Sequence, residues 1–193
     1  MDIITFGNKE DGKEYILRPA VYCVMFNSQN NKVAIIKTGD GDYFLPGGGI
    51  EGNETHEECI KREALEEMGM DIEIGNFIGC AKGYFYSPHD LKYYLSEGYY
   101  YKCDIGKEIS KPIEEDHLLL WLEPSQAIIT LLHEHQSWAV IEALKIMEKL
   151  LEFNEKQIEF LNNTLEQFAN SIQSEQNQPK QALSKIQKMK TDI

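Results

Sequence analysis

Positive charge is scarce in this sequence. Lysine and arginine number 19 against 32 aspartates and glutamates, so the formal net charge is -13 at pH 7 and the isoelectric point is about 4.8. A surface of this sign repels phosphate backbones and anionic lipids, which excludes non-specific binding to nucleic acid or to membranes. Small nucleotides are not excluded, because a bound metal ion can supply positive charge locally.

Cysteine and long apolar runs are also in short supply. Four widely spaced cysteines, without a Cys-x-x-Cys pair, are typical of reduced thiols in a cytosolic protein; they are Cys23, Cys59, Cys80 and Cys103. No stretch approaches the roughly 18 apolar residues of a membrane-spanning helix. A signal peptide has a basic region followed by an apolar run, and residues 1–12 lack this pattern. We therefore expect a cytoplasmic protein.

Glycine and glutamate are concentrated in residues 48–70. If 55–68 is helical, Glu63, Glu66 and Glu67 fall on one face, since residues three and four apart are neighbours. Like charges this close repel one another. A hard divalent cation such as Mg²⁺ removes the repulsion by taking the carboxylate oxygens as ligands. We predict that these three glutamates bind a metal.

The residues that flank this helix fit the same purpose. Gly47 and Gly48 permit positive φ and a close backbone approach, so we predict that both bind substrate. Arg62 can hold an acidic neighbour such as Glu54 in a bidentate pair. Gly69 ends the helix, as a glycine commonly does. The glycine loop can therefore fold the helix back so that its acidic face meets the end of the preceding strand.

Together these residues resemble the Nudix box, in which a glycine is followed after five residues by Glu, and after seven more by Arg-Glu-x-x-Glu-Glu-x-Gly. Every fixed position matches in register over 23 residues: Gly48, Glu54, Arg62, Glu63, Glu66, Glu67 and Gly69. The resemblance covers roughly residues 1–148. It implies a hydrolase that uses Mg²⁺ or Mn²⁺ to cleave nucleoside diphosphates linked to another group, with Glu66 or Glu67 polarising the attacking water.

Hydrophobic patterning predicts strands at 3–6, 15–26, 33–37, 43–45, 93–105 with an interruption at Gly98, and 118–122, and one or two strands over 72–86, broken near Gly75-Asn76 or Gly79. It also predicts helices at 55–68, from Pro124, and from Ser137 onward. This order supports an α/β fold with a mixed sheet between helices. The resemblance narrows it to the Nudix α/β/α sandwich over 1–148. We predict that 149–193 is a helical extension with a polar linker near 173–179.

Three further residues outside the box helix complete the predicted site. Glu115 lies in a loop where some Nudix enzymes carry a catalytic or metal-binding glutamate, so it joins Glu66, Glu67 and Arg62 as the predicted catalytic set; its neighbours Glu114 and Asp116 are alternatives. Arg18, in the central strand, needs a partner, which is either a substrate phosphate or an internal salt bridge. Phe44 can stack a base.

The histidines receive no predicted role. His133 and His135 lack the helical His-x-x-x-His spacing of a metal site, and we expect them on a helix surface or in a loop. His89 and His117 are single loop residues.

The substrate stays open at this point. A nucleoside triphosphate such as 8-oxo-dGTP is the default for a short member of the family, with ADP-ribose, nucleotide sugars and dinucleoside polyphosphates as alternatives. Many ADP-ribose enzymes carry a proline at a set distance after the box. Here none occurs between Gly69 and Ser87, and Pro88 comes later than that pattern, which counts against ADP-ribose. A non-catalytic Nudix-fold regulator is the other alternative, although degenerate members usually lose box glutamates and this sequence keeps them.

The C-terminal region carries an apolar seam with alternating steps of three and four residues, at Leu144, Met147, Leu151, Asn154, Ile158, Leu161, Leu165, Phe168 and Ile172. Such a heptad pattern predicts a helix that needs a partner. We predict a homodimer through this helix, with Asn154 setting the register; folding back onto its own domain or pairing in a wider bundle are the alternatives.

Overall fold

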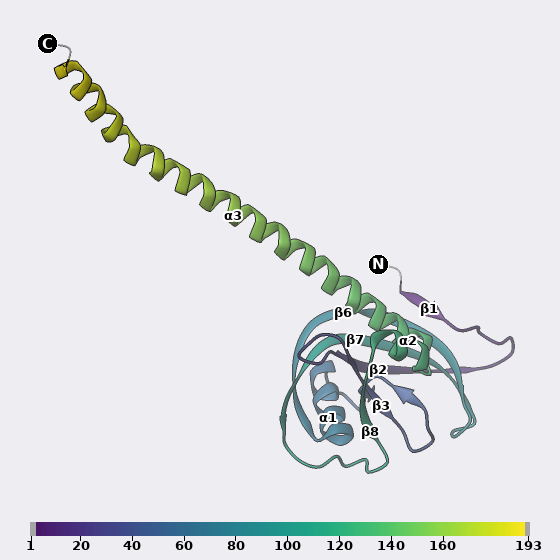
Figure 1. Cartoon of the computed structure of the whole chain (residues 1–193). Coiled ribbons are helices and arrows are strands. Elements are labelled where there is room, and N and C mark those ends of the chain that lie inside the picture. The colour runs from purple at the N-terminus through teal and green to yellow at the C-terminus, as the bar shows by residue number, and fades with distance from the viewer. Residues whose placement is uncertain (1–2, 192–193) are drawn as a thin grey trace. The chain divides into compact units, whose positions relative to one another are not determined.

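The computed structural model describes the backbone of residues 3–191 and the side chains of residues 3–167 (Figure 1). The chain divides into two compact units, with the boundary after Lys145. The first unit contains the strands, α1, α2 and the first turns of α3, and the second unit is the remainder of α3.

Two sheets build the first unit, one ordered β1-β6-β7-β2-β5 and one ordered β4-β3-β8. The strands are β1 (Ile4–Phe6), β2 (Tyr15–Met25), β3 (Val33–Lys37), β4 (Tyr43–Phe44), β5 (Gly47–Gly49), β6 (Met70–Ser87), β7 (Lys92–Glu108) and β8 (Leu118–Leu122); the helices are α1 (His56–Met68), α2 (Pro124–Thr130) and α3 (Glu134–Thr191). β1 with β6 and β2 with β7 pair in parallel, whereas β6 with β7 is antiparallel. The larger sheet is therefore mixed, and its long strands β6 and β7 run side by side along one curve (Figure 1).

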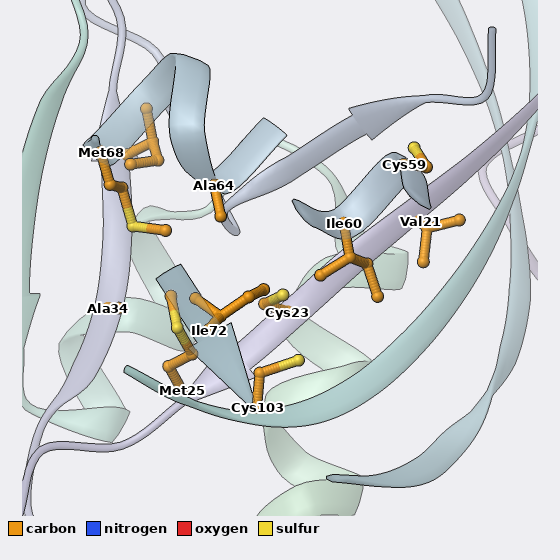
Figure 2. Packing of buried hydrophobic residues seen from close by; sticks show 11 residues of the cluster. Val21, Cys23, Met25, Ala34, Cys59, Ile60, Ala64, Met68, Ile72 and Cys103 are labelled. Carbon is orange, nitrogen blue, oxygen red and sulfur yellow. The ribbon is translucent and has the colours of Figure 1, made fainter. Parts of the chain in front are cut away.

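Alternating side chains of β2 supply a core to each face of the larger sheet. Val21, Cys23 and Met25 are buried and pack with the apolar side of α1, as Figure 2 shows. Because successive strand residues point to opposite faces, Tyr22 lies on the other face, where its ring stacks on that of Tyr100 with 5.6 Å between centroids. The predicted α/β/α sandwich with a mixed sheet and a C-terminal helix is thus confirmed.

Capping residues set both ends of α1. The Thr55 hydroxyl accepts a hydrogen bond from the Glu58 N–H, and the Glu58 carboxylate accepts one from the Thr55 N–H at 2.8 Å; such a cap contributes about 1 kcal/mol. At the other end Gly69 takes a φ of 66°, and a Cβ there would collide with the Ser110 carbonyl. Gly69 therefore lets the loop after β7 approach the end of the helix.

Two glycines in β6 make room for the first turns of α3. A Cβ on Gly79 would lie 2.8 Å from the indole of Trp138, and one on Gly83 would collide with the imidazole of His135. His135 is only 2% exposed, and its Nδ1 is hydrogen-bonded to the Tyr100 hydroxyl. The prediction that His135 lies on a helix surface or in a loop is wrong, because these contacts bury it.

Strands Val33–Lys37 and Leu118–Leu122 lie where they are predicted. The interruption predicted at Gly98 is wrong, since β7 runs through it and the missing side chain leaves room for the Tyr100 hydroxyl. β6 is also one strand, with irregular register on both sides of Phe77.

The second unit is a single helical segment that begins at Ile146. It continues through 173–179, the residues predicted as a polar linker. Its seam side chains are exposed: Leu151 61%, Ile158 58%, Leu161 56% and Leu165 65%. Phe168 and Ile172, later positions of the predicted seam, lie outside the described side chains. Across the helices described, none is both long and apolar enough to cross a membrane.

Candidate active site

The glycine loop of β5 packs directly on the acidic face of α1. The Gly47 N–H donates a hydrogen bond to Oε2 of Glu67 at 2.9 Å. Gly47 has a φ of 127°, and a Cβ there would collide with the Val21 carbonyl. A Cβ on Gly48 would occupy the space of the Glu63 carboxylate. Both glycines are therefore required by the carboxylates and the strand that they contact.

Arg62 holds the box carboxylates in position. Its guanidinium binds Glu54 in a bidentate pair at 2.8 and 3.1 Å, as the sequence predicts. The same group donates to Glu63 and Glu66, each at 2.9 Å, and to the Gly49 carbonyl at 3.0 Å. Hydrogen bonding to Arg62 lowers the pKa of Glu54 to about 2. These contacts make Arg62 a positioning residue for the acidic face.

Glu67 is the most deeply placed carboxylate of the site. Its side chain is 6% exposed, and burial raises its pKa well above the usual range, with further contributions from the charges of Glu63 and Glu114. Burial also raises the pKa of Glu63, although Arg62 opposes that shift. Negative charge is thus costly here unless a cation accompanies it.

The loop between β7 and β8 brings two more side chains that could bind a metal, those of Glu114 and His117, to this cluster. The N–H groups of Ile113 and Glu114 donate to the Glu66 carbonyl at 2.8 and 3.1 Å, which ties the loop to the end of α1. Glu114 then faces His117, and His117 Nδ1 lies 3.7 Å from Oε1 of Glu67. Ligand atoms of Glu67, Glu114 and His117 all lie within 4.8 Å of one another.

Glu115, predicted as catalytic, is exposed and does not belong to this group. Its alternative, Glu114, takes the place beside Glu67. Asp116, the other alternative, instead packs close to Gly39.

The donor set fits a hard divalent cation. Oxygen donors dominate, as Mg²⁺ and Mn²⁺ prefer, and one imidazole nitrogen is available from His117. Buried Oε2 of Glu114 and Nδ1 of His117 each lack a partner with hydrogen-bond geometry. Glu67, Glu114 and His117 are the residues whose ligand atoms lie close enough together to hold a metal, whereas Glu63 and Glu66, also predicted as ligands, are hydrogen-bonded to Arg62.

Two cavities share part of their lining, and the smaller of them adjoins the acidic face. The smaller, about 270 Å³, is lined by Gly47, Gly48, Glu63, Glu67, Glu114 and His117 among others. The larger, about 610 Å³, extends over the ends of β4 and β6 and the start of α3. Arg18, Phe44, Phe85 and His133 line both cavities. A single ligand can therefore occupy the two together, with one part beside the acids and the other in the larger space.

Arg18 stands where these cavities meet. It is exposed rather than buried, and within the described part of the chain no ion pair involves it. Of the two predicted partners, this geometry leaves Arg18 accessible to a phosphate.

Aromatic side chains surround the same point. Phe44 and Phe85 contact the ring of His133, with centroids 5.6 and 4.7 Å away. Phe85 also stacks against Tyr94, with 5.4 Å between the ring centroids. Burial lowers the pKa of His133 to about 4, with a smaller contribution from Arg18. The ring is therefore neutral near pH 7 and acts as an aromatic wall.

Sequence reasoning missed three residues of this region. The Glu114–His117 spacing of three, inside a turn, is a signal that could have been used for His117. His133 lines both cavities, and no local sequence pattern around it predicts that position. Gln136 is fully buried, and its Oε1 accepts a hydrogen bond from the Leu45 N–H at 2.8 Å. That contact holds the strand end before the glycine loop and joins residues far apart in sequence.

Comparison with known proteins agrees with this geometry. Residues 16–144 match the family described as NUDIX domain. The chain is 32% identical to an 8-oxo-dGTP diphosphatase of Buchnera aphidicola subsp. Schizaphis graminum, over 47% of this chain and 83% of that protein. It is 36% identical to an ADP-ribose pyrophosphatase of Methanocaldococcus jannaschii, over 37% of this chain but only 46% of that protein.

Among solved structures, the MutT protein from Methanosarcina mazei Go1 superposes with a TM-score of 0.53 at 18% identity, covering 68% of this chain and 96% of that one. At this identity the likeness concerns the fold. The family match, the complete box and the packed acidic face lead to one assignment: the chain belongs to the Nudix family of hydrolases, which act on phosphorus-containing acid anhydrides.

Proposed function

We propose that the protein is a Mg²⁺-dependent pyrophosphohydrolase, with Mn²⁺ as an alternative ion, that cleaves the diphosphate bridge of a nucleoside triphosphate or a related nucleotide. The observation that carries this proposal is the shared lining of two cavities. The acidic cavity has the ligands to hold a metal and a diphosphate, and the larger one has room for a nucleoside. Arg18 at the junction can bind a phosphate between them.

The carboxylates divide the work according to their exposure. Glu63 and Glu67, with side chains 13% and 6% exposed, are held by Arg62 and Gly47 and would bind the metal. Glu66 is 33% exposed and can reach water as well as the ion. When bound, the metal supplies positive charge that neutralises the phosphate oxygens and draws them to the acidic face.

Hydrolysis then needs water to attack one phosphorus of the bridge. A new P–O bond forms from the water oxygen to that phosphorus, the P–O bond to the bridging oxygen breaks, and the bridging oxygen leaves with the other phosphate. The proton of the attacking water passes to Glu66 or Glu67. Arg18 holds a phosphate at the cavity junction, and Phe44 with Phe85 can contact the base. The products are a nucleoside monophosphate and pyrophosphate, or a nucleoside monophosphate and the phosphorylated second group.

A panel of nucleotides, with products identified by mass, tests this proposal. It should include 8-oxo-dGTP, unmodified nucleoside triphosphates, ADP-ribose, nucleotide sugars and dinucleoside polyphosphates, each with Mg²⁺, with Mn²⁺ and with excess EDTA. We expect metal-dependent cleavage of a triphosphate between the α and β phosphates. Nucleotide binding without any product would instead favour the non-catalytic regulator.

We further propose that the protein works in the cytoplasm. All four cysteines are free thiols, and Cys23, Cys59 and Cys103 are buried. Burial raises the pKa of Cys59 to about 12, which keeps this thiol protonated and unreactive.

A further inference from the structure

The larger cavity is lined by more negative than positive charge. Asp40, Asp42 and Glu134 contribute exposed carboxylates, and Arg18 is the one arginine or lysine in the lining that is described. Asp40 and Asp42 come from the turn between β3 and β4, whereas Glu134 begins α3. Carboxylates therefore face this space from two different elements.

The histidines of the cavity do not balance these acids. Burial lowers the pKa of His133 to about 4 and that of His135 to about 3, so both are neutral near pH 7. His89 Nδ1 lies 3.4 Å from a carboxylate oxygen of Asp90, which adds a further negative charge beside the lining. The net charge of the lining stays negative.

The single positive group lies at one end of the cavity. Arg18 also lines the smaller cavity, so it faces the place where the diphosphate would bind. Once Arg18 is engaged by that diphosphate, an anionic group deeper in the larger cavity meets carboxylates with no cation to offset them.

We propose that Asp40 and Asp42, together with Glu134, make the larger cavity a charge filter that accepts an uncharged nucleoside and rejects one bearing a further phosphate. This inference rests on the proposed pyrophosphohydrolase function and deepens it. Nucleoside 5′-triphosphates are accepted, because all their phosphates would lie in the smaller cavity beside the acidic face and only the uncharged nucleoside would enter the larger cavity. Nucleotides with a 3′-phosphate, and RNA with a 5′-triphosphate, are selected against.

The test compares one nucleoside 5′-triphosphate with the same nucleotide carrying an added 3′-phosphate. We expect the wild-type protein to prefer the first by about tenfold or more in kcat/KM at low ionic strength, mainly through KM, with a smaller preference in 0.5 M salt because exposed charges are screened. Asp40→Asn with Asp42→Asn should bring the two substrates to within about threefold. Calorimetry in EDTA, with the 5′-monophosphate and the 3′,5′-bisphosphate as ligands, should show the same change in binding.

Asp104→Asn with Glu108→Gln is the matched control, because it removes the same charge from exposed positions outside the cavity lining. It should leave the preference unchanged. Equal use of both substrates by the wild type, or an unchanged ratio in the Asp40 and Asp42 variant, would overturn the filter while leaving the hydrolase intact. Failure to cleave any nucleoside 5′-triphosphate that lacks a 3′-phosphate would instead overturn the proposed function.

A second inference concerns the helical unit by itself. Between Leu151 and Leu165 the seam of α3 exposes large apolar side chains, each more than half accessible. Phe153 and Phe160, at 59% and 67% exposed, add a parallel row seven residues apart. Contiguous apolar surface of this kind on a helix marks an interaction site.

Charge and polarity at the seam favour a parallel, in-register second copy as the occupant. Asn154 is the one polar residue among the seam positions up to Leu165. In a parallel, in-register pair it would face Asn154 of the second copy. Glu148 and Glu155 flank the seam on one side. An antiparallel pair would bring these glutamates together, whereas a parallel pair places them beside the other flank, which contains Leu150.

We infer that the chain self-associates through this seam of α3. Light scattering at micromolar concentration should give at least twice the 22.2 kDa mass of one chain. Ile158→Glu should return the mass to one chain, and Asn163→Glu, which adds the same charge off the seam, should not.

Catalytic activity of both variants reports that the first unit is folded, so a change in mass can be assigned to the helix. A wild-type protein at the mass of one chain, or an Ile158→Glu variant that stays associated, would overturn the inference.

Discussion

The two units of this chain use the same kinds of residue in opposite ways. In the first unit, apolar residues of α1 such as Ile60 and Ala64 are at most 2% exposed, and carboxylates are gathered into a partly buried site. In the helical unit, apolar residues such as Ile158 and Leu161 are more than half exposed, and glutamates lie on the surface. The first unit therefore completes its core within one chain and gathers its carboxylates into one site, whereas the helical unit leaves its apolar surface exposed.

The contrast implies that chemistry and assembly can be changed separately. Substitutions at the acidic face should alter activity and metal affinity while the mass of the particle stays constant. Substitutions at the seam should alter the mass of the particle while activity and metal affinity stay constant.

The largest effect is expected from Glu67→Gln. This change keeps the shape of the side chain and removes the charge that we propose binds the metal, so we expect kcat to fall by a hundredfold or more, about 3 kcal/mol. Steady-state kinetics with the best substrate of the panel measures it. Glu57→Gln, at an exposed position on the same helix, should be nearly neutral; full activity of the Glu67 variant, or activity that persists in excess EDTA, would contradict the metal site.

Metal binding should stabilise the first unit. An ion that binds only the folded state adds about 2.7 kcal/mol to the free energy of unfolding at a concentration of 100 Kd. Thermal unfolding in millimolar Mg²⁺ or Mn²⁺ should therefore give a higher Tm than in EDTA. In the double variant Glu63→Gln with Glu67→Gln, the Tm in either ion should differ little from the Tm in EDTA. A wild-type Tm that neither ion raises would count against a preformed site.

Acid should destabilise the first unit through its buried histidine. The pKa of His135 is about 3 in the folded protein and about 6.5 when unfolded, so between these values the unfolded chain binds a proton that the folded chain does not. Stability is thus lost as pH falls below about 6.5, by about 2 kcal/mol between pH 7 and pH 5 for one such group.

Denaturant unfolding of wild type and His135→Gln at both pH values checks this. The variant should be less stable at pH 7, because it loses the Tyr100 contact, but its stability should depend less on pH. The raised pKa of Glu67 acts with the opposite sign in both proteins, so it cancels in the comparison. If the free energy of unfolding changed with pH by the same amount in both proteins, the pH dependence could not be assigned to His135.

Gly48→Ala should impair activity without removing any charge. The new Cβ would take the space of the Glu63 carboxylate, so we expect about a tenfold loss of kcat/KM, about 1.4 kcal/mol. Gly52→Ala is the control: its φ of 55° makes alanine strained, but no atom lies within 4 Å of the added Cβ. The control should lose stability and keep its activity, and equal activity in the two variants would argue against a steric requirement at Gly48.

The smallest effect on catalysis is expected at the helical seam. Ile158→Glu should change the measured mass and leave kcat and KM within about twofold of wild type, because no residue of the seam from Leu151 to Leu165 lines either cavity. A large loss of activity would show that assembly and catalysis are coupled, and the contrast between the two units would then fail.

The sequence by itself determined the features that depend on short spacing. The helix repeat places Glu63, Glu66 and Glu67 on one face, Thr55 and Gly69 mark the helix ends, and each of these predictions concerns residues within about four turns of one another. The Arg62–Glu54 pair lies within the same reach. The heptad seam is also a local pattern, which is why its exposed apolar residues could be named before the fold was known.

Tertiary structure decided what depends on residues far apart in the chain. Glu114 rather than Glu115 joins the acidic face because backbone hydrogen bonds to the Glu66 carbonyl set the register of its loop, and His117 follows from that register. His135 is buried because Gly83 leaves room for it across the sheet. In a loop, neighbouring residues have no fixed periodicity, so only the contact that anchors the backbone determines which side chain points into the site.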